Sequence, residues 1–164
     1  MNSFYVMDLA TVIGLFFTAG TLVFSVIQYR KQKKHDKRKD TLEAYHKLQK
    51  EVLDKLYIDY TDGIVLEIVT NYRRKEYAEE YHKLGVYLAR IEHFCVGINQ
   101  DIYDWKTLYE LAHKFFDLTI RRRIEILVTR KDSFANEEMY ENLKKVWQRM
   151  DKETERRKKK GHRK

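Results

Sequence analysis

The sequence predicts an all-α protein, with an N-terminal transmembrane helix that continues into a cytosolic bundle of four to five helices. Three observations carry this prediction. The 164 residues include no Pro and only six Gly, so the residues that mark turns in β-rich folds are scarce. A stretch of 21 residues near the N-terminus carries no charge. In the rest of the chain, apolar residues recur at helical spacing.

The uncharged stretch, Leu9–Tyr29, is long enough to cross a bilayer. At about 1.5 Å of rise per residue it reaches roughly 31 Å, which matches a hydrocarbon core. Asp8 is the only charge before Arg30, whereas a secretory signal peptide would begin with Lys or Arg. A buried core helix is the alternative, and the length of the stretch favours a retained membrane helix.

Basic residues follow this stretch at once and predict its orientation. Residues 30–39 contain seven Lys and Arg against one acid, Asp36. The positive-inside rule places such a flank in the cytoplasm. We therefore expect a single-pass protein with its N-terminus outside and its C-terminal body in the cytosol.

The net charge of +8 is concentrated towards the two ends of the chain. Residues 151–164 hold eight basic residues against three acids, while residues 40–150 hold 18 basic and 20 acidic residues. This excludes a uniformly basic nucleic-acid-binding protein. We expect the basic ends to contact anionic head groups or phosphate, with RNA a possible partner, through Arg30, Lys31, Lys33, Lys34, Arg156 and Lys158.

The sequence thus divides into four parts. Residues 1–29 form the extracytoplasmic N-terminus and transmembrane helix, and residues 30–41 form a basic juxtamembrane helix. Residues 42–150 form the cytosolic helical bundle, and residues 151–164 form a basic C-terminal tail.

Small and polar residues recur along the membrane helix at spacings of three and four, which places them on one face. This polar stripe consists of Thr11, Gly14, Thr18, Thr21, Ser25 and Gln28. One interpretation is close helix packing, since Ala10, Gly14 and Thr18 form a small-xxx-small pattern. The other is a ring of identical helices whose polar faces line an aqueous path. The stripe alone favours packing and leaves both open.

The body is predicted from apolar stripes and helix-end signals. An apolar stripe from Leu42 to Leu56 extends the first helix, and Asp62-Gly63 is a turn signal. A short apolar run follows, and then a helix that is expected to end at Gly97. Asp104 is expected to cap a helix that runs past Ile120, and Asn136 to cap the last one.

No motif of a known catalytic or metal site occurs in the chain, and we expect no cofactor and no metal. The remaining signal is Arg157 followed by His162, a pair that can cleave RNA in helical nucleases, where His moves the 2′-hydroxyl proton and Arg stabilises the phosphate. Arg156 with His162 and Arg30 with His35 fit the same spacing. With 13 Arg and 6 His such pairs also arise by chance. A phosphate-binding tail is therefore favoured over catalysis, and we expect no enzyme activity.

The layout of one N-terminal span, a compact helical bundle and a late Arg157…His162 pair resembles the small single-span membrane accessory protein of type VI-B CRISPR systems. That protein accompanies the RNA-targeting effector nuclease. The resemblance implies a divergent HEPN-like helical fold. The segment Glu92–Asp104, EHFCVGINQDIYD, is also similar to a signature of a widespread bacterial single-span family.

The resemblance implies a function in anti-phage defence. The chain would assemble as a homo-oligomeric pore in the bacterial inner membrane and depolarise the cell once the RNA-guided effector has recognised its target. The pair Arg157 and His162 departs from working HEPN nucleases, because it lies within eight residues of the C-terminus. Two alternatives remain: a membrane-tethered HEPN-type RNase that uses this pair, and a non-conducting anchor or adaptor for a partner.

Overall fold

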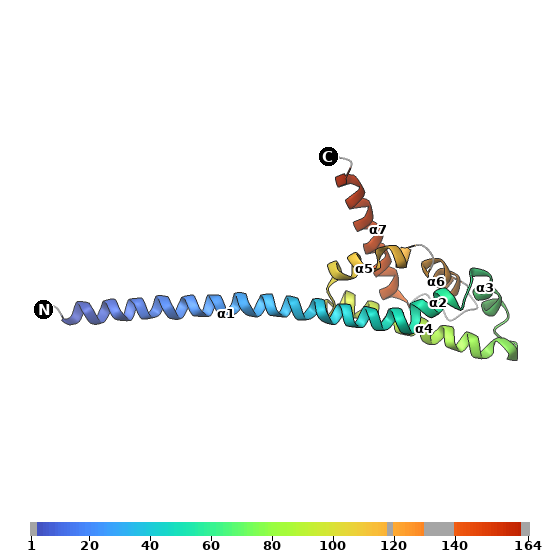
Figure 1. Cartoon of the computed structure of the whole chain (residues 1–164), viewed down its shortest axis with the longest axis horizontal. Helices are drawn as coiled ribbons and strands as arrows, with labels where there is room; N and C mark the ends of the chain where they lie inside the picture. The colour runs from blue at the N-terminus through green and yellow to red at the C-terminus, as the bar shows by residue number, and fades with distance from the viewer. Residues whose placement is uncertain (1–2, 118–119, 130–139, 162–164) are drawn as a thin grey trace. The chain divides into compact units, whose positions relative to one another are not determined.

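The computed structural model describes residues 3–117, 120–129 and 140–161, and the regular structure in these ranges is entirely helical (Figure 1). The prediction of a helical protein is therefore confirmed. The chain divides into two compact units, Met1–Lys37 and Arg38–Lys164. We call the second unit the body.

The first unit consists of the N-terminal part of helix α1, Ser3–Leu48. Every residue from 11 to 36 is exposed, including large apolar side chains such as Phe16, Phe17 and Leu15 at 65% or more. Among the described residues, one helical stretch is long and apolar enough to cross a membrane. It begins at Thr11, and its most apolar 18-residue window has a mean hydropathy of 1.8 with none of it buried. We call residues 9–29 the apolar segment.

The helix continues past the basic stretch, as predicted, because neither Pro nor Gly interrupts it there. In the body, α1 passes into a π-helical turn, Gln49–Leu53, and then into the short helix α2, Asp54–Ile58. The buried face of this stretch supplies one side of the core, with Thr41, Tyr45, Leu48, Val52 and Leu56.

Helix α3, Asp62–Thr70, corrects one prediction. Asp62 and Gly63 lie in its first turn and do not form a separate turn. The chain reverses just before them, and Thr61 caps the helix by accepting a hydrogen bond from the Ile64 amide at 3.3 Å. Asp62 is favourable at this end because its charge complements the helix dipole.

Helix α4, Lys75–Asn99, packs against α3, α7 and the π-helical turn, and it corrects a second prediction. Gly97 does not end it, because the helix runs on to Asn99 and the left-handed residue is Asp101, with φ at 59°. Gly97 is needed for close approach instead. A Cβ there would lie 2.5 Å from the ring of Tyr103.

Three further helices complete the body: α5 (Trp105–Asp117), α6 (Ile120–Thr129) and α7 (Glu141–Gly161). Helix α7 packs on α4 and α5, and α6 packs on α3 and α5. The predicted cap at Asp104 is confirmed, since its carboxylate accepts from the Thr107 amide at 2.8 Å. Residues 118–119, within the helix predicted to run past Ile120, and the predicted cap Asn136 lie outside the described residues.

Candidate functional site

The polar stripe of the apolar segment satisfies its own hydroxyl groups. Thr18 donates to the Gly14 carbonyl, Thr21 to the Thr18 carbonyl and Ser25 to the Thr21 carbonyl, each at 2.8 Å. Each hydroxyl proton is therefore used within the helix, while each oxygen keeps lone pairs that can accept a further hydrogen bond. The three hydroxyl groups can therefore be buried against another helix without an unsatisfied donor, and their oxygens can also accept hydrogen bonds from water.

A second surface of the same segment, which surrounds Gly20, was not identified from the sequence. Apart from their own helix backbone, neither Gly20 nor Gly14 has a heavy atom within 4 Å of the position a Cβ would take. A shallow hollow of about 350 Å³ surrounds Gly20, lined by Phe16, Phe17, Thr21 and Phe24. The placement of Phe four residues before and after a Gly was the available signal.

The basic flank after the apolar segment is solvent-exposed. Arg30, Lys31, Lys33 and Lys34 are all exposed, and among the described residues none of them forms an ion pair. Asp36 accepts a hydrogen bond from Gln32 at 2.8 Å and lies 3.7 Å from His35. The four cations are thus available to anionic groups outside the chain. The contact with head groups or phosphate remains a prediction.

Arg157 is held by contacts within the body. Its guanidinium lies 4.3 Å from the centre of the Tyr109 ring on α5, and its Nε donates to Glu153 at 3.0 Å. This hydrogen bond lowers the pKa of the Glu153 carboxyl. The Tyr109 hydroxyl also shares a hydrogen bond with Thr154 at 2.9 Å. Arg157 therefore joins α7 to α5. Its predicted partner His162 lies outside the described residues, so their joint role stays a prediction.

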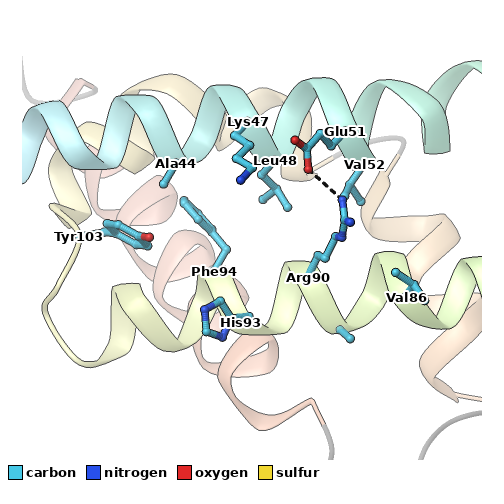
Figure 2. A pocket seen from close by; sticks show the side chains of 11 residues that line it. Ala44, Lys47, Leu48, Glu51, Val52, Val86, Arg90, His93, Phe94 and Tyr103 are labelled. Atoms are coloured by element: carbon cyan, nitrogen blue, oxygen red, sulfur yellow. Dashed lines mark hydrogen bonds and ion pairs between the residues drawn. The ribbon is translucent and has the colours of Figure 1, made fainter.

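A groove of about 570 Å³ crosses the body between the stretch Ala44–Val52 and helix α4. Figure 2 shows an ion pair across it, in which Arg90 donates to Glu51 at 2.8 Å. Lys47 and His93 also line the groove, together with aliphatic side chains and the rings of Phe94 and Tyr103. The π-helical turn supplies Glu51 and Val52, and π-turns inside helices occur often at functional sites. No sequence motif signalled this groove, because its residues come from two distant segments.

Residues of the segment Glu92–Asp104 form hydrogen bonds and ring contacts that connect helices of the body. The Glu92 carboxylate caps α7 by accepting from the amides of Asn142 at 3.1 Å and Leu143 at 2.9 Å. The Asp104 amide donates to the buried hydroxyl of Thr41 at 2.7 Å. Phe94 and Tyr103 stack at 5.2 Å. These contacts give four residues of the segment structural roles in the body: Glu92, Phe94, Tyr103 and Asp104.

Cys95, within the same segment, is not a candidate for chemistry. It is completely buried, and burial raises the pKa of its thiol. A thiol that stays protonated is a weak nucleophile and a weak metal ligand. Among the described residues, no group of three His, Cys, Asp or Glu could hold a metal ion.

No protein-family model, no curated protein and no solved structure matches the chain. A function must therefore be argued from the residues and surfaces described above.

Proposed function

We propose that the chain is a single-pass protein of the bacterial inner membrane that forms a homo-oligomeric pore and depolarises the cell in RNA-guided anti-phage defence. In this proposal the body has a divergent HEPN-like fold and works with an RNA-targeting CRISPR effector, as the resemblance implies. The N-terminus lies outside and the body lies in the cytosol.

The observation that carries the proposal is the apolar segment with its polar stripe. Nothing in the described chain covers residues 11–29, so about 20 exposed residues, most of them apolar, require a bilayer or partner chains. A plain anchor needs no row of hydroxyls on one face. The stripe supports a role in which this face meets copies of itself or water.

The hydrogen bonding of the stripe supports a lumen that can hold water. The hydroxyl groups of Thr18, Thr21 and Ser25 donate to carbonyls of their own helix, and their oxygens can still accept hydrogen bonds from water. Replacing Thr18 and Thr21 by Leu would line the same face with methyl groups. Hydrophobic constrictions of this kind stop ions by dewetting.

The test is membrane potential in cells that express the chain together with a type VI-B effector and a guide matched to a phage transcript. We expect a voltage-sensitive dye to report depolarisation with the wild type and little with the variant Thr18→Leu/Thr21→Leu. The matched control is Val12→Leu/Val23→Leu, which places two leucines on the opposite face and should conduct. Membrane abundance must be equal in all three.

Three outcomes would contradict parts of the proposal. Equal depolarisation by all three forms would make the stripe a packing surface. Absence of depolarisation with the wild type would favour a non-conducting anchor. Purified wild-type protein should not cleave labelled RNA, and cleavage lost on His162→Ala would favour the RNase instead.

The orientation has a separate test. The buried Cys95 should not react with an impermeant thiol reagent on intact cells. We expect labelling of Ser3→Cys from outside intact cells and labelling of Lys50→Cys only after lysis. The reverse pattern would refute the orientation derived from the basic flank.

A further inference from the structure

Helix α7 carries a row of exposed cations, of which the sequence-based prediction named only Arg156. At about 100° per residue, their side chains fall within an arc of roughly 100°. Over 15 residues the row is about 22 Å long. Its members are Lys145, Arg149, Lys152, Arg156, Lys159 and Lys160, all exposed. Lys158, which was also predicted to contact phosphate, lies on a different face of the helix.

Three carboxylates near the row form ion pairs, two of them with a member of the row itself. Arg121 holds Asp151 with two hydrogen bonds, at 2.7 and 3.1 Å. Arg157 holds Glu153, which also lies 3.4 Å from Arg156. Glu141 pairs with Lys145 at 2.8 Å at the start of the row.

Four cations of the row keep their charge available. Within the described residues, no carboxylate forms an ion pair with Arg149, Lys152, Lys159 or Lys160. The row therefore presents a positive potential along one side of α7.

An aromatic ring lies beneath the row near its N-terminal end. The Arg149 guanidinium lies 4.1 Å from the centre of the Trp105 ring, which is half-buried. The ring restricts the guanidinium to one orientation, so less conformational freedom is lost when the guanidinium binds an anion. Cations that follow a backbone beside aromatic rings are the usual elements of surfaces that bind single strands.

The apolar side of α7 argues against a bilayer as the partner of this row. A helix that adsorbs to a membrane carries exposed apolar residues beside its cations. On α7 the apolar residues Leu143, Val146, Trp147 and Met150 are all buried in the core of the body. The exposed side chains of α7 are charged or polar, and its exposed cations lie mainly along one side.

We propose that the cation row of α7 binds single-stranded nucleic acid through its phosphates, with little dependence on base sequence. The row is narrow and straight, so it suits one strand of phosphates. This inference goes beyond the proposed function and does not depend on conduction, because it uses residues of the body alone. The same phosphate chemistry is offered by RNA and by single-stranded DNA, and the test separates them.

The test uses the full chain in nanodiscs of neutral lipid, with fluorescent 20-nucleotide probes of oligouridine and oligothymidine. Binding is measured by anisotropy between 50 and 200 mM salt. The row variant is Lys152→Gln/Lys159→Gln/Lys160→Gln. The matched control, Lys50→Gln/Lys55→Gln/Lys75→Gln, removes the same charge from three other exposed positions of the body. Circular dichroism checks that both variants fold.

We expect the row variant to weaken binding about tenfold at 100 mM salt and the control to change it by about twofold or less. The slope of log affinity against log salt should fall by roughly 2 for three lost phosphate contacts, since each contributes about 0.7 on a single strand. Tighter binding of oligouridine would assign RNA as the ligand, and equal binding would assign the shared phosphate backbone.

Three results would overturn the proposal. Equal weakening by the two variants would show that binding follows net charge and not this row. Absence of binding of the wild type to either probe would show that single-stranded nucleic acid is not the ligand. Loss of binding to phosphatidylserine vesicles in the row variant, with probe binding unchanged, would assign the row to the bilayer.

Discussion

The apolar segment and the body use apolar residues in opposite ways. In the body, Ile91 and Leu88 of α4 are completely buried, and most of the large apolar side chains lie in one core. In the apolar segment, Ile13 is 48% exposed and Phe16 is 74% exposed. The body therefore obtains its stability from contacts within the chain, whereas the segment depends on what surrounds it.

The two regions should differ most in how much an Ile→Ala substitution reduces the free energy of unfolding. Ile91→Ala leaves a cavity in the core, so it should reduce the free energy of unfolding of the body by about 2–5 kcal/mol. Ile13→Ala should leave the free energy of unfolding of the body unchanged, because the Ile13 side chain is exposed and packs in no core. The measurement is urea unfolding in detergent followed by tryptophan fluorescence, since Trp105 and Trp147 both lie in the body. Equal effects would mean that the segment contributes to the core.

Glycine substitutions should separate the regions in a second way. Gly97→Ala forces a Cβ against the Tyr103 ring and should destabilise the body by about 1–3 kcal/mol. Gly14→Leu replaces a residue at which a Cβ would meet nothing within 4 Å beyond its own helix backbone, so the unfolding midpoint of the body should not move. It should instead lower the size of the oligomer in detergent, measured by light scattering, because close helix approach is blocked. An unchanged oligomer would show that the body alone carries assembly.

A polar contact in the body should have a smaller effect. Glu92→Ala removes the carboxylate that accepts from two amides at the start of α7, and we expect a loss of about 1–2 kcal/mol. The control is Glu79→Ala on the exposed side of the same helix. If both substitutions have the same effect in urea unfolding, the Glu92 cap does not stabilise α7.

The smallest effect concerns alkaline pH. Burial raises the pKa of Tyr45 from 10 to about 12, with a smaller contribution from Asp54. The folded state favours the neutral phenol of Tyr45. The contribution of Tyr45 to the stability of the folded state is therefore complete below pH 10 and is lost as the pH rises towards 12. Tyr45→Phe should therefore flatten the fall in stability between pH 10 and 12, whereas Tyr29→Phe, at an exposed position, should not. Identical pH profiles for the two variants would remove Tyr45 as the cause.

Local signals were sufficient wherever a residue acts on its own helix. The cap at Asp104 was predicted from sequence because an Asp before a helix bonds to amides two or three residues away. The cation row of α7 could also have been found from the sequence, because its members follow helical spacing: Lys145, Arg149, Lys152 and Arg156. It was missed because the C-terminal charges were treated as a tail beginning at residue 151.

The sequence was not sufficient where packing against another part of the chain decides the role of a residue. Gly97 has the residue type of a helix end, but the helix runs on to Asn99, and the Tyr103 ring packs where a side chain at 97 would lie. Arg123, in a run of three Arg, was assigned no role from the sequence. Only 9% of it is exposed, and its guanidinium donates to the carbonyls of Leu56 at 2.6 Å and Tyr57 at 2.9 Å. No spacing in the sequence indicates either contact.

The sequence by itself determined the helical class, the exposed apolar segment and the basic flank, because these depend on composition, length and short-range periodicity. Only the tertiary structure decided which polar residues became part of the body. Glu92 acts as a cap for α7, Arg157 joins α7 to α5, and Arg90 and Glu51 meet across the groove. The physical reason is that a charge is stabilised by partners within a few ångströms, and helix packing brings those partners from residues 39 to 51 positions away in the sequence.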